Sequence, residues 1–386
     1  MKASLISPTL LNTTFPFSTD DEVMRAAHLQ TVERLFSEGN DVVFIEGPSG
    51  YGKTHILKQF VQKNSDHAIS YFVSVLDKHT YSRECFNDVI YTQLYFLLTG
   101  DESTSVRIPD NFIIQLRTEL DKKIRFLQHK KKFLFFVLDG LDALNQQGLQ
   151  TFKEILEDLP WGKIKFLFSG DSEKLEVLLP DKQKIKYKSI QVIPFNKEET
   201  TAYFRQIPNS EKFIEQIFTI SSDGIPQKLN QIKTICLDTG IDDFLIEFDS
   251  GNIDLYECEW QKVDNEKKRL VLSAIAFSET QLEDEKIARI LSFDTNTVKE
   301  ITNSLPFLTL TTKNCRIFKN EYFLNYSKKR LKTFESVVIR KLIRYILHND
   351  SLVEEFDLPS LYLRNKQWKE MINYYSYETF FNQLEK

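Results

Sequence analysis

The stretch VVFIEGPSGYGKTHIL, residues 42–57, decides the fold of this 386-residue chain. Its first four residues are apolar and mostly β-branched, which is typical of a buried parallel strand. GPSGYGKT follows with the spacing G-x-x-x-x-G-K-[ST], and Ile56, Leu57 and Phe60 then share one helical face. Only 12 glycines occur in the whole chain, and three of them fall here. A strand, a glycine-rich loop and a helix in this order predict a phosphate-binding loop.

The residue types of the loop suit nucleotide phosphates. Backbone N–H groups can form a concave nest for phosphate oxygens, and the following helix adds its positive N-terminal end. Lys53 is predicted to reach the β- and γ-phosphates and to assist catalysis, and the Thr54 hydroxyl is predicted to bind Mg²⁺. The residues predicted to surround ATP or ADP here are Gly47, Pro48, Ser49, Gly50, Tyr51, Gly52, Lys53, Thr54 and His55.

A second segment, KKFLFFVLDGLDAL at residues 131–144, supplies carboxylates. Phe133–Leu138 form a continuous apolar run, which predicts a buried strand that ends at Asp139. Asp139 is predicted to hold Mg²⁺ through water, and Asp142 to orient or activate the hydrolytic water. A helix N-cap is the alternative role for Asp142.

A third strand is predicted in KIKFLFSGDS, residues 163–172, over Lys163–Phe168. In this architecture the end of that strand lies beside the γ-phosphate. Ser169 is therefore a candidate to sense the nucleotide, and a loop serine without such a role is the alternative.

With these motifs the chain resembles STAND-class P-loop NTPases, especially the NACHT-like branch, which are related to AAA+ ATPases. The resemblance rests on the apolar strand with DGLD at residues 134–142 and on three later segments. These are IPFNKEETTAYF (193–204), which looks like the entry into a helical lid, SSDGIPQKLNQI (221–232), which looks like a G-x-P motif, and residues 267–312, which look like a winged-helix domain. The implied fold is an α/β P-loop NTPase, with a parallel sheet sandwiched by helices, followed by an all-α lid, a winged helix and a C-terminal helical segment.

The implied domains are 1–190 for the NTPase core, 191–245 for the lid, 246–332 for the winged-helix domain and 333–386 for the helical segment. The last segment is similar to the first hairpin of a helical-repeat sensor. Because one hairpin cannot bury both of its faces, we expect the native chain to continue beyond it, or the hairpin to dock on the core or on a partner. A plain C-terminal helical cap is the alternative.

The resemblance also assigns residues outside the loop. Pro226 would pack near the adenine, and Lys319 stands where relatives carry a histidine that touches the β-phosphate of ADP. A solvated surface lysine is the alternative for Lys319. Two departures from the family, Ser169-Gly170-Asp171 in place of Thr/Ser-Arg and Ala143 in place of an acidic residue, predict slow hydrolysis rather than lost binding.

The function implied by the resemblance is an ATP-operated molecular switch that couples nucleotide state to conformational change and oligomerisation. Its trigger or effector would be an unidentified protein, and relatives often act in antiviral defence or innate immunity. One alternative is a DNA-handling AAA+ ATPase of the replication-initiator type, and another is a scaffold that binds nucleotide without hydrolysing it. ATP is favoured over GTP because no N/TKxD-type guanine motif occurs near the expected place.

Charge bears on the DNA alternative. The formal net charge is −5, so there is no global basic field to attract nucleic acid. The expected recognition helix, residues 294–305, carries one Lys against one Asp and one Glu. Residues 313–344 carry ten Lys/Arg against two Glu, a net +8, so DNA contact through that segment stays open.

The four cysteines, Cys85, Cys236, Cys258 and Cys315, are far apart and form no CxxC pair, so we expect reduced thiols.

No apolar run approaches 18 residues, and the N-terminal segment lacks the continuous apolar core of a signal peptide. We therefore expect a cytoplasmic protein with no membrane partner.

Overall fold

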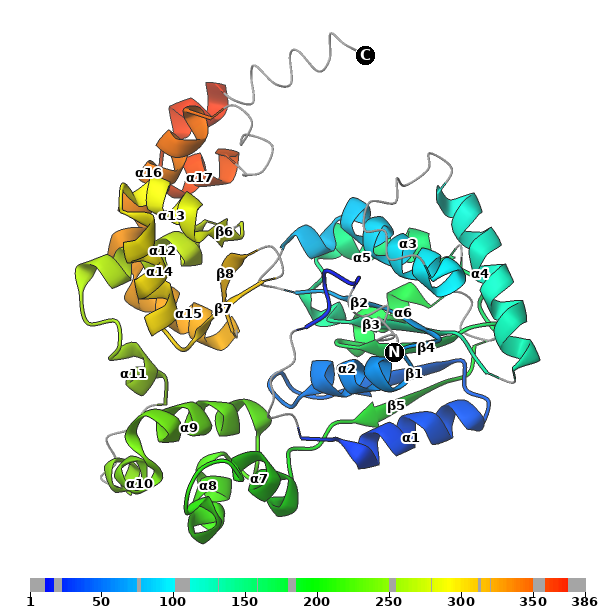
Figure 1. The fold of residues 1–386 in the computed structure, drawn as a ribbon. Helices are drawn as coiled ribbons and strands as arrows, with labels where there is room; N and C mark the ends of the chain where they lie inside the picture. The colour runs from blue at the N-terminus through cyan, green and yellow to red at the C-terminus, as the bar shows by residue number, and fades with distance from the viewer. Residues whose placement is uncertain are drawn as a thin grey trace, which may run out of the picture. The chain divides into compact units, whose positions relative to one another are not determined.

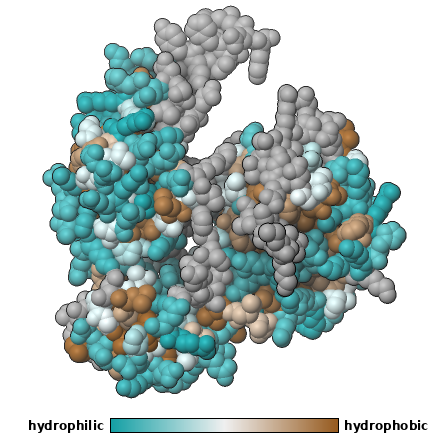
Figure 2. All heavy atoms as spheres, viewed as in Figure 1, coloured by the Kyte–Doolittle hydropathy of each residue, from teal (hydrophilic) through white to brown (hydrophobic). Residues whose placement is uncertain are grey.

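The computed structural model divides the chain into two compact units, Met1–Leu245 and Ile246–Lys386. The structure describes residues 11–16, 23–74, 78–100, 112–130, 132–157, 159–179, 185–249, 255–278, 280–311, 314–319, 321–349 and 358–373. Figure 1 shows the elements of each unit along the chain, and Figure 2 shows that the visible face is mainly hydrophilic. No helix among these described residues is long and apolar enough to cross a membrane.

The N-terminal unit is built on a five-stranded parallel sheet in the order β2-β3-β4-β1-β5. Its strands are β1 (Val42–Glu46), β2 (Ala68–Phe72), β3 (Phe135–Asp139), β4 (Lys165–Ser169) and β5 (Tyr187–Gln191). The three strands predicted from apolar runs all form, each within two residues of the expected start. Strand β3 includes Asp139 and β4 includes Ser169, so both polar residues lie at the carboxyl edge of the sheet.

Helices cover both faces of this sheet. They are α1 (Ala26–Ser37), α2 (Lys53–Lys63), α3 (Arg83–Thr99), α4 (Phe112–His129), α5 (Gln146–Glu157) and α6 (Ser172–Leu178), with short 3₁₀ turns η2 (Lys78–Tyr81) and η3 (Leu141–Ala143). Side chains alternate along β1, so Val43 and Ile45 pack with α1 and α2, whereas Val42 and Phe44 pack with α3 to α6. The predicted sandwich of helices around a parallel sheet is confirmed.

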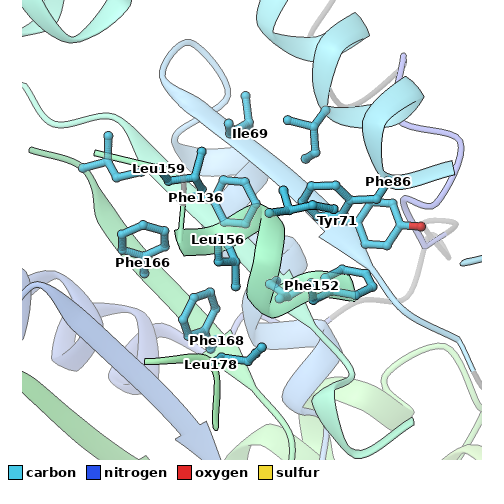
Figure 3. Packing of buried hydrophobic residues seen from close by; sticks show 14 of the residues in the cluster. Ile69, Tyr71, Phe86, Phe136, Phe152, Leu156, Leu159, Phe166, Phe168 and Leu178 are labelled. Carbon is cyan, nitrogen blue, oxygen red and sulfur yellow. The ribbon is translucent and has the colours of Figure 1, made fainter. Parts of the chain in front are cut away.

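Aromatic residues fill the second of these two layers. Figure 3 shows Phe136, Phe166 and Phe168 from the strands facing the helical side chains Phe86 and Phe152. The rings of Phe86 and Phe152 meet edge to face, with centroids 4.9 Å apart. This apolar layer anchors β3 and β4, and it thereby fixes the strand ends that carry Asp139 and Ser169.

The unit continues with a group of helices that we call the lid: α7 (Lys197–Phe204), η4 (Ser210–Phe213), α8 (Ile214–Ile220) and α9 (Pro226–Thr239). Helix α10 (Ile241–Asp249) follows. Asn196 and Glu199 form a reciprocal capping box that starts α7. Gly224 lies between α8 and α9 with φ of 88°, and Pro226 occupies the first turn of α9, as the sequence predicts. Phe195 N–H donates to the Gly224 carbonyl at 2.9 Å, which ties the entry of α7 to the entry of α9.

The C-terminal unit packs helices around a three-stranded antiparallel sheet in the order β6-β8-β7. Its elements are α11 (Leu255–Trp260), α12 (Glu266–Phe277), β6 (Leu282–Glu283), α13 (Asp284–Leu291), α14 (Thr295–Ser304), β7 (Leu308–Leu310), β8 (Cys315–Phe318), α15 (Glu321–Arg330), α16 (Lys332–Leu347) and α17 (Leu358–Arg364). The predicted three helices and strand pair are present, and the two-residue strand β6 adds a third strand. One apolar core extends from Trp260 at the end of α11 to α17. Residues 350–357 and 374–386 of the predicted C-terminal helical segment lie outside the described residues.

A buried ion pair fixes the smaller sheet to its helices. The Arg316 guanidinium on β8 donates to both carboxylate oxygens of Asp284 on α13, with Nε–Oδ1 at 3.0 Å and Nη2–Oδ2 at 2.9 Å. The Thr302 hydroxyl donates to the same carboxylate, and Asn303 accepts from Arg316, so α14 joins the network. Bidentate geometry with extra hydrogen bonds is the arrangement in which a buried pair is best compensated.

Candidate nucleotide-binding site

The glycine-rich loop joins β1 to α2 at the carboxyl edge of the parallel sheet. Gly52 has a φ of 91° and caps α2, and Gly50 has a φ of 84°. Both lie in the left-handed region, which residues with a Cβ rarely adopt. The predicted strand, loop and helix therefore form, with Lys53 as the first residue of α2. Figure 1 shows the loop between β1 and α2.

The Lys53 ammonium is folded over the loop. Its Nζ donates to the Gly47 carbonyl at 2.8 Å and to the Pro48 carbonyl at 3.4 Å. The same atom lies 3.7 Å from Oδ2 of Asp142, and the Lys53 side chain is only 10% exposed. The fold thus holds one positive charge over the loop, where phosphate oxygens can replace its present acceptors.

Asp139 is the buried carboxylate of the site. It is 4% exposed, and burial raises its pKa, while hydrogen bonds from the Ser169 and Thr54 hydroxyls act in the opposite direction. The structure therefore brings together three residues predicted from separate segments of the chain: Thr54, Asp139 and Ser169. A carboxylate beside a hydroxyl is the hard oxygen donor set that Mg²⁺ prefers, so the residues present fit that ion.

Asp142 lies in the turn η3 directly after β3. Its side chain is 48% exposed and faces Lys53. The capping interpretation fits Asn145 better, because its Oδ1 accepts from the Gly148 N–H in the first turn of α5 at 2.8 Å. Asp142 is the more accessible of the two predicted catalytic carboxylates, as a group that contacts water must be.

The end of β4 explains why no arginine follows Ser169. Ser169 is fully buried, and its hydroxyl donates to Oδ1 of Asp139. A Cβ at Gly170 would lie 2.7 Å from the backbone nitrogens of both Leu141 and Asp142, and Gly170 has a φ of 133°. A side chain at this position would collide with the turn that carries Asp142. The packing of this turn against the end of β4 therefore requires glycine at position 170, where the STAND-class pattern has arginine.

The lid reaches the loop through the N-terminal end of α9. Gln227 N–H donates to the Gly50 carbonyl at 3.2 Å, and a Cβ at Gly50 would lie 2.2 Å from Oε1 of Gln227. A Cβ at Gly52 would lie 3.9 Å from Cγ of Pro226, so Pro226 is next to the loop, where a nucleotide-binding role requires it to be. Sequence reasoning identified Pro226 but missed Gln227, because no local pattern reveals which lid residue meets the loop.

A second missed feature is Arg25, which precedes α1 and is 1% exposed. Its Nη1 has no hydrogen-bond partner among the described residues, and it would lie 3.9 Å from a Cβ at Gly52. The neighbouring side chain of Met24 is 62% exposed and that of Ile193 is 61% exposed.

The remaining predicted residues are distributed as follows. Ser49 and Tyr51 lie in the loop. The Tyr51 side chain packs against the apolar layer formed with α1 and α2. His55 on α2 contacts Gln59, with the two Nε2 atoms 2.9 Å apart. Lys319 belongs to the C-terminal unit, where it follows β8 and donates its backbone N–H to Phe307. Its contact with nucleotide stays a prediction.

Comparisons with known proteins agree with this geometry. Residues 23–167 match the AAA ATPase domain family. An uncharacterized ATP-binding protein of Pyrococcus abyssi is 25% identical over a comparison of 104 residues, which covers 24% of this chain and 31% of that protein. A solved STAND protein of Pyrococcus horikoshii with a tetratricopeptide repeat sensor superposes with a TM-score of 0.53 and 14% identity, over 95% of this chain and 52% of that one. Cdc6p of Pyrobaculum aerophilum gives a TM-score of 0.37 and 14% identity, over 86% of this chain and 97% of that one.

The fold is that of a P-loop NTPase, and residues 23–167 are similar to the AAA ATPase domain family. The resemblance to STAND-class proteins that the sequence predicts is confirmed at the level of fold. The chain spans about half the length of the STAND protein, and the matched segment spans under a third of the Pyrococcus abyssi protein. Because the TM-score with Cdc6p is below 0.5, this similarity does not indicate whether the chain binds DNA.

Proposed function

We propose that this chain is a STAND-type switch that binds ATP and Mg²⁺, hydrolyses ATP slowly and changes its conformation and assembly with the bound nucleotide. The observation that carries the proposal is the convergence at the loop: Lys53 contacts Gly47 and Asp142, while Thr54 and Ser169 bond to Asp139. These side chains come from three separate segments, and each has the chemistry that its predicted role requires.

Each residue of the proposed site would have a distinct role in binding or hydrolysing the nucleotide. Loop N–H groups and the Lys53 ammonium would hold the β- and γ-phosphates, and Thr54 and Asp139 would hold Mg²⁺. When bound, Mg²⁺ offsets negative charge on the phosphate oxygens. Asp142, half exposed beside Lys53, would orient the attacking water. Hydrolysis would be slow because Gly170 leaves no room for an arginine and Ala143 supplies no second acid.

The switch itself would use the lid and the C-terminal unit. We interpret α12–α14 with β6–β8 as a winged-helix domain, because the element order and the antiparallel sheet agree with that fold. Nucleotide shifts such an equilibrium only by its differential affinity for the two arrangements. The role in antiviral defence or innate immunity that the resemblance implies stays a prediction.

The test begins with purification without added nucleotide and mass spectrometry of any bound nucleotide. Titration with a fluorescent ADP or ATP analogue follows for wild type, Lys53→Ala and Lys63→Ala. Lys63 lies on the same helix and pairs with Glu33 at the surface, so its removal is a matched loss of charge. Loss of binding in Lys53→Ala alone supports the site. Equal affinity in all three proteins overturns it.

A DNA-handling ATPase is the second candidate. The observation in its favour is a basic last turn of α15, with Lys328, Lys329 and Arg330, although Arg330 pairs with Glu257. Phosphate contacts by such a surface would make DNA binding fall steeply with salt. Binding that is lost in the Lys328→Ala/Lys329→Ala double variant would support this candidate, and no binding at low salt would remove it.

A further inference from the structure

Arg25 is an arginine at the junction of the phosphate-binding loop, α1 and the lid, and it is 1% exposed. Arginine is almost never buried to this degree unless it is paired. Burial lowers the pKa of Arg25, and Glu199 acts in the opposite direction. A cation in this place must be held there by specific contacts.

Those contacts lie on the lid and on the segment that leads into it. Nη2 of Arg25 donates to the Ile193 carbonyl at 2.6 Å, and Nε lies 3.4 Å from Oε1 of Glu199. The guanidinium carbon lies 4.9 Å from the centre of the Phe195 ring, within the range of a cation–π interaction. Nη2 also approaches Nδ1 of His28 at 3.4 Å. One side chain thus touches three successive features of the lid entry.

The backbone of Arg25 is tied to the helix that follows the loop. Arg25 N–H donates to Oε1 of Gln59 at 2.9 Å, and Nε2 of Gln59 donates to the Val23 carbonyl at 2.8 Å. Gln59 is buried on α2, the same helix that begins with Lys53. Arg25 therefore connects the loop helix to the lid.

The lid end of this connection is equally well fixed. Glu199 caps α7 through Oε2, which accepts from Asn196 N–H at 3.0 Å, and its Oε1 remains for Arg25. Phe195 bonds to Gly224, which leads into α9, and Gln227 of α9 bonds to Gly50 of the loop. The series of contacts starts at α2 and returns to the loop through α7 and α9, and Figure 1 shows where these three helices lie.

We propose that Arg25 is a positioning residue that latches the lid to the phosphate-binding loop through Ile193, Phe195 and Glu199, and that it thereby sets how fast bound nucleotide leaves. The inference rests on the proposed nucleotide site. The proposed role of Arg25 is to hold the lid against the loop, not to contact the nucleotide. Glu199 on α7, whose side chain is 22% exposed, is therefore as important for this role as Arg25 itself.

The experiment measures the release of a fluorescent ADP analogue by chase with unlabelled ADP, in wild type, Arg25→Lys, Glu199→Gln and the double variant. Lysine keeps the charge but cannot make the forked contacts of arginine. Glutamine can still serve in the capping box, so Glu199→Gln should fold. Glu198→Gln, at the next position on α7 and exposed, is the matched control.

We expect each single variant to release the analogue at least about ten-fold faster, with an unchanged association rate, and the double variant to be no faster than the singles. Glu198→Gln should match wild type. Acceleration in Arg25→Lys without acceleration in Glu199→Gln would overturn the latch and indicate direct contact with nucleotide. Additive effects, or no acceleration, would also overturn it. If wild type binds no analogue, the proposed function fails first and the latch fails with it.

Discussion

Asp142 is the residue on which the hydrolysis proposal depends most directly. Its side chain is 48% exposed and lies 3.7 Å from the Lys53 ammonium. Asp142→Asn keeps the shape and removes the charge. We expect affinity for ATP to change by less than about three-fold and turnover to fall by about 10²–10⁴-fold, the usual contribution of a general base.

The measurement is phosphate release at saturating ATP and Mg²⁺. Asp121→Asn is the control, because Asp121 on α4 has a side chain that is 44% exposed and pairs with Lys163 away from the site. Turnover equal to wild type in Asp142→Asn would remove this residue from the catalytic set. No measurable turnover in the wild type would favour the scaffold that does not hydrolyse nucleotide.

The residue scale also shows what the sequence could predict. The loop, Asp139 and Asp142 are recognisable because a short motif or an apolar strand fixes their local geometry. Arg25 and Gln227 are not, because their importance comes from contacts with residues far away in the chain, Glu199 and Gly50. The predicted Ser169 is present at the site, but its hydroxyl bonds to Asp139, a pairing that only the strand register reveals.

At the scale of elements, the apolar runs predicted β1, β3 and β4, whereas β2, β5 and β6 were not predicted. Leu282–Glu283 is too short to show an alternating pattern, and it becomes a strand only by pairing with Arg316 and Cys315 of β8. Helix α11 is also short, six residues, and its last turn carries an acid with an unusual environment.

Glu259 on α11 gives a prediction about pH. It is 6% exposed, its Oε2 has no hydrogen-bond partner among the described residues, and burial raises its pKa to about 7 despite Lys319 and Lys262. Because the folded state then binds more protons than the unfolded state between the ordinary pKa of 4.5 and about 7, stability falls as pH rises through this range and stays lower above it.

Glu259→Gln removes this titration. We expect it to stabilise the C-terminal unit by roughly 2–3 kcal/mol at pH 8 and to have little effect near pH 4.5. Urea unfolding at the two pH values measures the difference, with Glu300→Gln, an exposed acid on α14, as the control. Equal effects of Glu259→Gln at both pH values would show that folding does not raise the pKa of Glu259.

At the scale of the whole molecule, the lid belongs to the same compact unit as the phosphate-binding loop, and a second unit begins at Ile246. The first unit is joined internally by Arg25 and Gln227, so lid position and loop geometry depend on each other. A nucleotide that binds the folded first unit stabilises it by mass action. For the protein to act as a switch, nucleotide binding must also change the equilibrium between monomer and oligomer.

Assembly is therefore the property that separates a switch from a simple ATPase. We expect a monomer with ADP and a larger species with ATP and Mg²⁺, measured as mass by light scattering after size exclusion. Asp142→Asn should hold the larger species for longer, because it retains ATP, and Lys53→Ala should remain monomeric under both conditions. Mass that is unchanged by ATP in wild type, together with ordinary turnover, would contradict the switch. The lid latch would then regulate only nucleotide exchange, and the basic turn of α15 would become the surface to examine with DNA.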